Sequence, residues 1–232
     1  MAQKINPISF RLGSAQIWNS NLQIYGKSYF IYSSLLFRYL EINNLIEKIL
    51  KLKGLSMNNQ EWKIGKAKIK LVICYSELVF LKTKPKLPLF RTLFNLVNSW
   101  LSEKIVITLY FTRPGKSLFN DFLTEYSRYL MHMNMPSKKV IWSISKFIKV
   151  HLGNEKVISY KKGILKIKLK GFKISLSGRL EDSKSQMAKN VQHSEGSLPL
   201  NTVKNYIDYS NSVIYTKNGT CGLKIWLFYE FY

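Results

Sequence analysis

Apolar residues recur every three to four positions in several stretches of the chain, and this spacing predicts amphipathic helices. In the first stretch, Leu36, Leu40 and Ile46 cluster toward one side. Proline residues separate the later stretches, because Pro is tolerated in the first turn of a helix but breaks its interior. We therefore expect helices over 35–52, from Pro85 to Trp100, over 116–135 and, after Pro136, over 137–150.

Strands are expected where polar and apolar residues alternate, or where short apolar runs stand between turn residues. In one such stretch, Lys66, Lys68 and Lys70 alternate with apolar neighbours. The dipeptide Asn218-Gly219 predicts the turn of a C-terminal hairpin. The expected strands cover 66–81, 104–111, 163–180 with a turn at Gly171, 206–216 and 223–228.

Three stretches lie outside these elements. Residues 1–33 show no sustained period and are expected to form an irregular arm, and the polar stretch 181–198 is expected to be an exposed loop. Gly54 and the polar segment 57–59 are expected to break the chain after the first helix. Helices and strands mixed in both halves of the chain predict an α+β fold.

Charge narrows the class of partner. The chain has 36 Lys and Arg against 13 Asp and Glu, a formal net charge of +23 on 232 residues, and its hydrophobic content of 46% is enough for real cores. A folded domain with this surplus repels itself, so a polyanion is the natural partner. A nucleic-acid backbone is such a polyanion, and releasing its condensed counterions drives binding without reading sequence.

The same sequence offers little for catalysis, metal binding or membrane insertion. Cys74 and Cys221 are too few and too far apart for a zinc site, and the three His are isolated. No nucleophile-elbow or phosphate-binding-loop motif occurs. No apolar run reaches the roughly 18 residues that a membrane-spanning helix needs. We expect no catalytic residue, no metal, no cofactor and no membrane partner.

Composition indicates an organellar origin. Only six of the 36 basic residues are Arg, although Arg is the better bidentate phosphate ligand. This bias toward Lys, with abundant Ile, Asn, Tyr and Phe, is typical of AT-rich organelle genomes. The N-terminus lacks both a signal-peptide core and the Arg-rich helix of an imported precursor, which fits a protein made inside the organelle.

The helix expected over 137–150 separates its charge from its apolar residues. At about 100° per residue, its four lysines and Trp142 fall within roughly 100° of one another, and the apolar residues fall on the other side. Amphipathicity explains the apolar face, but it does not explain why the polar face has no acidic residue. The cationic face consists of Lys138, Lys139, Trp142, Lys146 and Lys149.

Three stretches resemble the family of the universal small-subunit ribosomal protein number three. The N-terminal stretch 1–20 resembles the opening of that family through Lys4-Ile5-Asn6-Pro7, Arg11-Leu12-Gly13 and Trp18-Asn19-Ser20. The stretch 171–180, Gly-Phe-Lys-Ile-Ser-Leu-Ser-Gly-Arg-Leu, resembles the strand before its exposed loop. The C-terminal signature is matched in order and spacing by Ala188-Lys189, Gly196, Leu198, Asn201, Ile207-Asp208, Thr216, Gly219 and Gly222.

This resemblance implies a fold of three parts. They are an N-terminal rRNA-contacting arm (1–34), a KH domain of the second type (35–111) and a C-terminal α/β domain with antiparallel strands (112–232). KH domains clamp single-stranded RNA with a G-x-x-G loop, but the equivalent turn at 82–85 reads Lys-Thr-Lys-Pro. We therefore expect a degenerate clamp, because a backbone without Gly cannot approach phosphates as closely. Residues 152–170 look like an insertion.

The resemblance also implies a function: a structural, non-enzymatic constituent of the small ribosomal subunit, lying in the head near the mRNA entrance. Its partners would be rRNA, mRNA and small-subunit proteins four, five, ten and fourteen. The expected location is the mitochondrial ribosome, with a plastid as the alternative. The cationic face of 137–150 would line the mRNA entrance. The expected rRNA-binding residues are Lys4, Asn6, Arg11, Trp18, Arg179, Lys184, Lys189 and Lys204.

Several alternatives stay open at this level. Trp142 and Trp18 each suit base stacking or packing against protein. Lys82, Lys84 and Lys86 suit either an RNA contact or a solvated turn. The rival function is an intron-encoded maturase or endonuclease, which would need paired acidic residues for its metals. Asp121, Asp182 and Asp208 are scattered, which favours the ribosomal reading.

The charge generates the first prediction. The isolated chain should bind RNA strongly but with little sequence preference, and its affinity should fall steeply as salt rises, because each Lys–phosphate contact releases counterions. Filter binding at a series of salt concentrations measures this slope. An affinity that does not respond to salt would show that the cations are not the source of binding.

Overall fold

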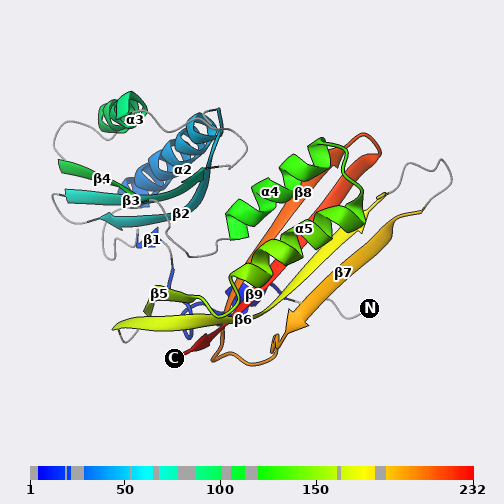
Figure 1. Cartoon of the computed structure of the whole chain (residues 1–232). Coiled ribbons are helices and arrows are strands. Elements are labelled where there is room, and N and C mark those ends of the chain that lie inside the picture. Colours follow the sequence, from blue (N-terminus) through cyan, green and yellow to red (C-terminus); the bar gives the residue numbers. More distant parts are fainter. Residues whose placement is uncertain are drawn as a thin grey trace. The chain divides into compact units, whose positions relative to one another are not determined.

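The structure, a computed structural model, describes residues 5–18, 20–21, 29–52, 54–64, 68–77, 87–100, 106–112, 120–160, 163–180 and 187–232. Contacts within the chain divide it into two compact units. One unit is Asn19–Pro114, and the other combines Met1–Trp18 with Gly115–Tyr232 (Figure 1). The chain therefore enters the second unit at its N-terminus, leaves it, and returns.

The described residues of the unit 19–114 form a mixed four-stranded sheet and two helices. The strands run in the order β1-β2-β3-β4, with β2 and β3 antiparallel and β3 and β4 parallel. Its core contains Trp62, whose indole N–H donates to Asn43 Oδ1 at 3.1 Å. The elements are β1 (Ser20–Asn21), α2 (Tyr29–Leu52), β2 (Leu55–Ile64), β3 (Lys68–Glu77), α3 (Leu87–Trp100) and β4 (Val106–Thr112).

Two expectations for this unit were wrong. The first helix begins at Tyr29 rather than at residue 35, and residues 55–64 form β2 where a chain break was expected. The pairing of β2 with β3 shifts register between Met57 and Asn59. This bulge interrupts the alternation that identifies a strand in a sequence, so the polar residues around it resemble a turn. The turn 82–85 lies outside the described residues.

The second unit is an antiparallel sheet with two helices on one face (Figure 1). The strands run in the order β5-β6-β9-β8, and β7 pairs with the second half of β6. Apolar residues of β6 and β9 pack against the buried side of α5, where Ile144 and Ile148 have no exposed surface. The elements are α4 (Asn120–His132), α5 (Ser137–Val150), β5 (Glu155–Tyr160), β6 (Gly163–Gly178), β7 (Lys189–Gly196), β8 (Tyr206–Thr216) and β9 (Gly219–Phe231).

The helices and the C-terminal hairpin were predicted correctly, and the region between them was not. Strand β6 runs through Gly171 without turning, with a bulge against β9 between Leu169 and Gly171. A Cβ at Gly171 would collide with the backbone of Ser197, so this glycine serves a close approach. The expected loop contains β7, an edge strand whose largely polar residues conceal it; 181–186 lie outside the described residues.

The N-terminal segment 5–18 is ordered against the second unit rather than irregular. It contains a short helix, α1 (Pro7–Arg11), which Asn6 begins by accepting a hydrogen bond from the Ile8 N–H at 2.9 Å. Gln16 Nε2 donates to the carbonyl of Ile207 in β8 at 2.6 Å, and Ala15 is buried. The sequence could not show this because the partners of the segment lie almost 200 residues away.

Arg11 fixes this segment to the rest of the unit. Its side chain has no exposed surface, and its guanidinium donates to the carbonyls of Pro7 at 2.9 Å, Leu200 at 2.8 Å and Thr202 at 2.8 Å. A guanidinium enclosed in this way is not accessible to a phosphate. We therefore remove Arg11 from the expected rRNA contacts and assign it the role of holding the segment in place.

This geometry predicts the effect of replacing Arg11. Arg11→Met keeps much of the bulk but leaves the Leu200 and Thr202 carbonyls without their donor, and it should lower the free energy of unfolding by about 2–4 kcal/mol. Urea unfolding measures this loss, and hydrogen exchange should rise within 5–18.

The matched control is Arg128→Met. Arg128 pairs with Glu125 on the same helix and is partly exposed, so its loss should cost below about 1 kcal/mol. Equal losses for the two variants would contradict the assignment of Arg11.

Candidate RNA interface

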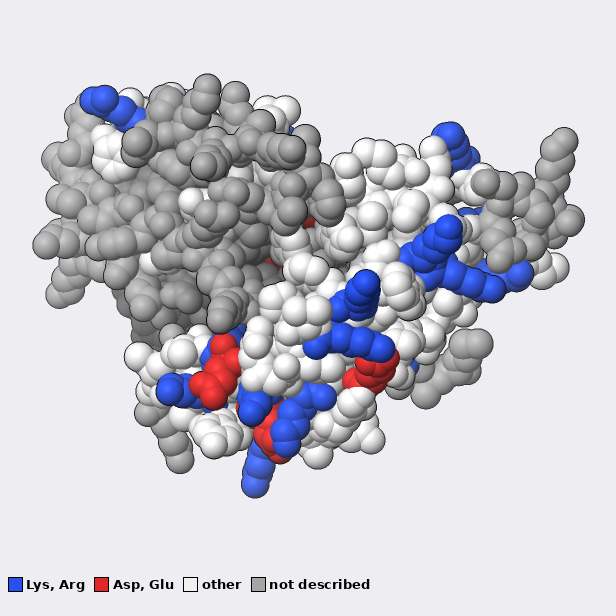
Figure 2. All heavy atoms as spheres, viewed as in Figure 1, with Lys and Arg blue, Asp and Glu red and all other residues white. Residues whose placement is uncertain are grey.

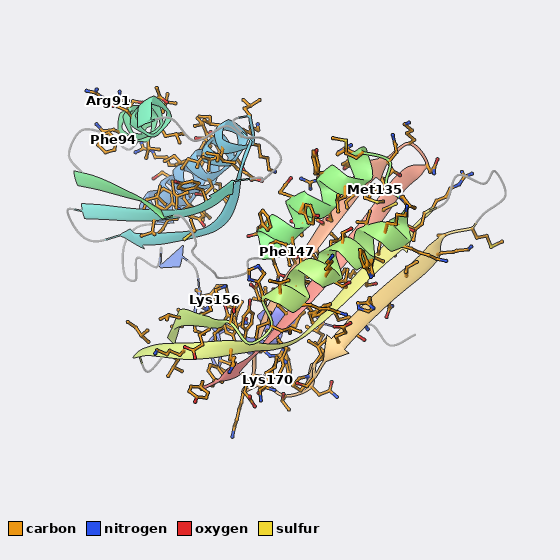
Figure 3. All side chains as sticks on the ribbon, in the orientation of Figure 1. Arg91, Phe94, Met135, Phe147, Lys156 and Lys170 are labelled. Carbon is orange, nitrogen blue, oxygen red and sulfur yellow. The ribbon has the colours of Figure 1, made fainter. Side chains whose placement is uncertain are left out.

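Helix α5 presents the cationic face that its sequence predicts. Val140, Ile144 and Ile148 are fully buried against the sheet, whereas Lys138 and Lys139 are exposed in the first turn. On the buried side, Phe147 reaches toward α4, where it contacts Phe122 and Tyr126 (Figure 3). The helix is thus held by one side, and its lysines face solvent.

Trp142 lies among these lysines with 65% of its surface exposed. Lys146 Nζ lies 5.3 Å from the centroid of the Trp142 ring, a cation–π contact. An exposed indole next to an ammonium group offers a base a stacking surface and offers the adjoining phosphate a counter-charge. Figure 2 shows Lys and Arg side chains over the part of this face formed by α5 and the neighbouring strands.

Lys149 differs from the other lysines of the helix. Its Nζ lies 2.6 Å from Glu195 Oε1 on β7, and this hydrogen bond, with a smaller contribution from His193, lowers the pKa of the Glu195 carboxyl. The carboxylate offsets the charge of Lys149 and ties it to the sheet. The periodicity of the helix could not reveal Glu195, because this acid belongs to β7 and not to α5. Within the described residues, the accessible cationic group is Lys138, Lys139 and Lys146 with Trp142.

The residues expected to contact rRNA come from separate elements. Trp18 is 64% exposed, Lys189 is exposed at the start of β7, and Lys204 is exposed in the segment before β8. Asn6 caps α1, and Arg179 is half-buried just after β6. Lys4 and Lys184 lie outside the described residues. The expected set is therefore distributed around the unit.

One group of side chains was not anticipated from the sequence. On the sheet face away from α4 and α5, the Tyr209 and Trp226 rings have centroids 5.4 Å apart, and Lys173 Nζ lies 5.7 Å from the Trp226 ring centroid. These residues come from β8, β9 and β6, in one row of the sheet. The alternation of side chains along a strand shows which residues of that strand share a face of the sheet. Only the register between strands shows that these three residues are cross-strand neighbours.

The described residues contain no cluster of three or more His, Cys, Asp or Glu side chains placed to hold a metal ion. Among the helices described, none combines the length and the apolar character that a membrane span requires.

Comparison with known proteins adds independent evidence. Residues 156–227 match the family model described as ribosomal protein S3, C-terminal domain. The chain is 44% identical to the small ribosomal subunit protein uS3m of Chondrus crispus over 229 residues, which cover 99% of this chain and 94% of that protein. The bacterial uS3 proteins of Citrifermentans bemidjiense and Beijerinckia indica are each 26% identical, over 98% of this chain and 96% and 84% of theirs.

The match to the Chondrus crispus protein spans nearly the full length of both chains, and its family agrees with that of the bacterial relatives and of the domain model. The chain therefore belongs to the uS3 family of small ribosomal subunit proteins, in the mitochondrial form of that family.

Proposed function

We propose that this chain is a structural constituent of the small subunit of the mitochondrial ribosome, binding rRNA in the head and lining the mRNA entrance. The observation that carries the ribosomal role is the 44% identity to a mitochondrial uS3 protein across almost the whole of both chains. The proposed role is structural, not enzymatic. Its proposed neighbours are rRNA, mRNA and small-subunit proteins four, five, ten and fourteen.

The rRNA part of the proposal is supported by charge and exposure. The net charge of +23 favours association with a polyanion, because a folded domain with this surplus repels itself. Lys189 and Lys204 are exposed on different elements, and Trp18 extends an aromatic ring from the N-terminal segment. These positions suit an extended rRNA surface contacted at several points, since most protein contacts to nucleic acid go to the backbone and fix orientation.

The unit 19–114 is our candidate for the KH domain. Its helix α3 connects β3 to the parallel strand β4, which suits a mixed KH-type sheet. The boundaries proposed from the sequence were 1–34 for the arm, 35–111 for the KH domain and 112–232 for the C-terminal domain. Because α2 begins at Tyr29 and the compact unit spans Asn19–Pro114, we propose that the KH domain begins before residue 35. The Lys-Thr-Lys-Pro turn at 82–85 lies outside the described residues, and we propose on its sequence that the RNA clamp is degenerate.

The mRNA-entrance part of the proposal rests on α5. Lys138, Lys139 and Lys146 expose ammonium groups on the side of the helix that also carries Trp142. Lysine is a flexible point charge rather than a planar bidentate donor. A helix of this kind holds a passing strand by diffuse attraction and stacking, which permits the strand to move.

The ribosomal assignment predicts sedimentation behaviour. In a density gradient of mitochondrial extract, an epitope-tagged full-length chain should migrate with small subunits and remain there at moderate salt. Migration with intron-containing transcripts instead would support a maturase, and pelleting with membranes would support a peripheral membrane protein.

The proposed entrance role predicts the phenotype of a charge reversal on α5. Lys138→Glu with Lys139→Glu should leave subunit assembly intact but slow translation through a stable mRNA hairpin several-fold, because two attractive charges become repulsive at the helix surface. Translation of hairpin-containing and unstructured messages by the same ribosomes measures the ratio.

The matched control is Lys138→Arg with Lys139→Arg, which keeps both charges and adds bidentate donors. It should translate both messages at least as well as the unchanged chain. If the Glu variant fails to assemble, or reads hairpins normally, these residues do not line the mRNA entrance.

A further inference from the structure

The antiparallel sheet of the second unit has two unlike faces. Side chains alternate along each strand, and those toward α4 and α5, such as Ile174, Ile214 and Ile225, are fully buried. The other parity carries aromatic, basic and small polar side chains. We call it the open sheet face: Lys173, Ser175 and Ser177 of β6, Asn190, Gln192 and Ser194 of β7, Tyr209, Asn211, Val213 and Tyr215 of β8, and Lys224 and Trp226 of β9.

Of the described residues, the N-terminal segment 5–18 lies at one end of this face, against β8. There, Ile207 and Phe228 pair across β8 and β9 and are buried, and Gln16 donates to the Ile207 carbonyl. Beyond that end exposure rises along the strands: Tyr209 and Trp226 are half-buried, Asn211 and Lys224 are exposed, and Val213 and Tyr215 are 49% and 72% exposed, whereas Ser175 is buried. Exposed aromatic and apolar side chains gathered on one face are a feature of interaction surfaces, whereas single exposed ones are ordinary.

Register arranges this surface in rows across four strands. In the first row Tyr209, Trp226, Lys173 and Ser194 are cross-strand neighbours, and in the next row Asn211, Lys224, Ser175 and Gln192 are. Rows two residues apart are separated by about 7 Å along the strands. The first row places the Tyr209 and Trp226 rings beside the ammonium group of Lys173. The second row contains another lysine and the side-chain amides of Asn211 and Gln192.

Charge decides which occupant this surface fits. The twelve residues of the open sheet face include two lysines and no acid. Among the described residues, the acids nearest in sequence to this face are already paired: Glu195 contacts Lys149 on the helix side, Asp208 lies 3.9 Å from Lys156, and Glu230 pairs with Lys170. A protein partner would gain little from such a face unless it were acidic, whereas unpaired bases stack on aromatic rings while lysines follow the phosphates.

We propose that the open sheet face binds an unpaired segment of RNA, with a base stacked on Trp226 and Tyr209 and the adjoining phosphates near Lys173 and Lys224. This inference rests on the proposed ribosomal function and adds to it a second, separate RNA contact on the side of the sheet opposite α5. The amide groups of Asn211 and Gln192 lie in the next row, where they can contact base edges.

Crosslinking tests the two RNA contacts separately. The purified full chain is bound to a 4-thiouridine oligonucleotide of about twelve unpaired nucleotides, irradiated, and digested for mass spectrometry. We expect crosslinks to the peptides that contain Tyr209, Tyr215 or Trp226, and to the α5 peptide at Trp142. The same label placed in a perfect RNA duplex should not crosslink to the open sheet face, because its bases are already stacked.

Variants separate this inference from the proposed function. Lys224→Glu, at an exposed position, and Trp226→Ala should each reduce the open-face crosslinks about tenfold and leave those at Trp142 unchanged; Trp226→Phe should retain most of them. Trp142→Ala is the matched control and should do the reverse. Circular dichroism checks that each variant is folded. If Trp226→Ala is unstable, the open-face crosslinks of Lys224→Glu and Tyr215→Ala test the inference instead.

Two results would overturn the inference. Absence of crosslinks on β8 and β9, while those on α5 persist, would show that the open sheet face does not bind RNA and would leave the proposed function intact. Equal crosslinking by duplex RNA would show attraction by charge without stacking. Loss of the α5 crosslinks alone would count against the entrance role and not against the open sheet face.

Discussion

Pairing of β6 with β9 is the interaction on which the second unit depends. The two strands pair from Ile167 with Phe231 to Ser177 with Gly222, and β6 also pairs with β5 and β7 while β9 pairs with β8. Helices α4 and α5 contact each other, and both also pack on the sheet that this pair organises. The pairing joins residues about 50 positions apart, and closing a loop of that length costs conformational entropy. The contacts of the assembled sheet offset this cost.

Net charge sets the second constraint, because 13 Asp and Glu residues are available to pair with 36 Lys and Arg residues. Glu195, Asp208 and Glu230 are each used near a lysine of another element. These contacts reduce repulsion where strands and helices meet. Among the described residues, they leave Lys138, Lys139 and Lys146 of α5 and the two lysines of the open sheet face without an acidic partner, whereas Lys149 of α5 pairs with Glu195. The distribution directs positive charge to two opposite faces of one sheet. A surface arranged in this way fits a polyanion that contacts the protein on more than one side.

The elements that the sequence predicts well are those whose signal is local. Helix α5 carries its period and its preceding proline within 15 residues, and the C-terminal hairpin carries its turn at Asn218 and Gly219. The errors share one cause, which is that distant partners decided the outcome. A bulge hides β2, an edge position allows β7 to be polar, and the backbone of Ser197 explains Gly171. Distant partners also explain Arg11, which was expected to contact RNA but is buried and donates to the carbonyls of Leu200 and Thr202.

The candidate binding residues also differ in whether one element or several elements supply them. The cationic face of α5 was predictable because one helix supplies all of it, and only its pairing with Glu195 was hidden. The open sheet face was not predictable, because Lys173, Tyr209 and Trp226 come from three strands and meet only through register. Both surfaces nevertheless contain the same pair of groups, an indole with a lysine ammonium 5.3 or 5.7 Å from its centroid. If both surfaces bind RNA as proposed, tryptophan beside lysine would supply the planar contact that arginine, rare in this chain, makes in other proteins.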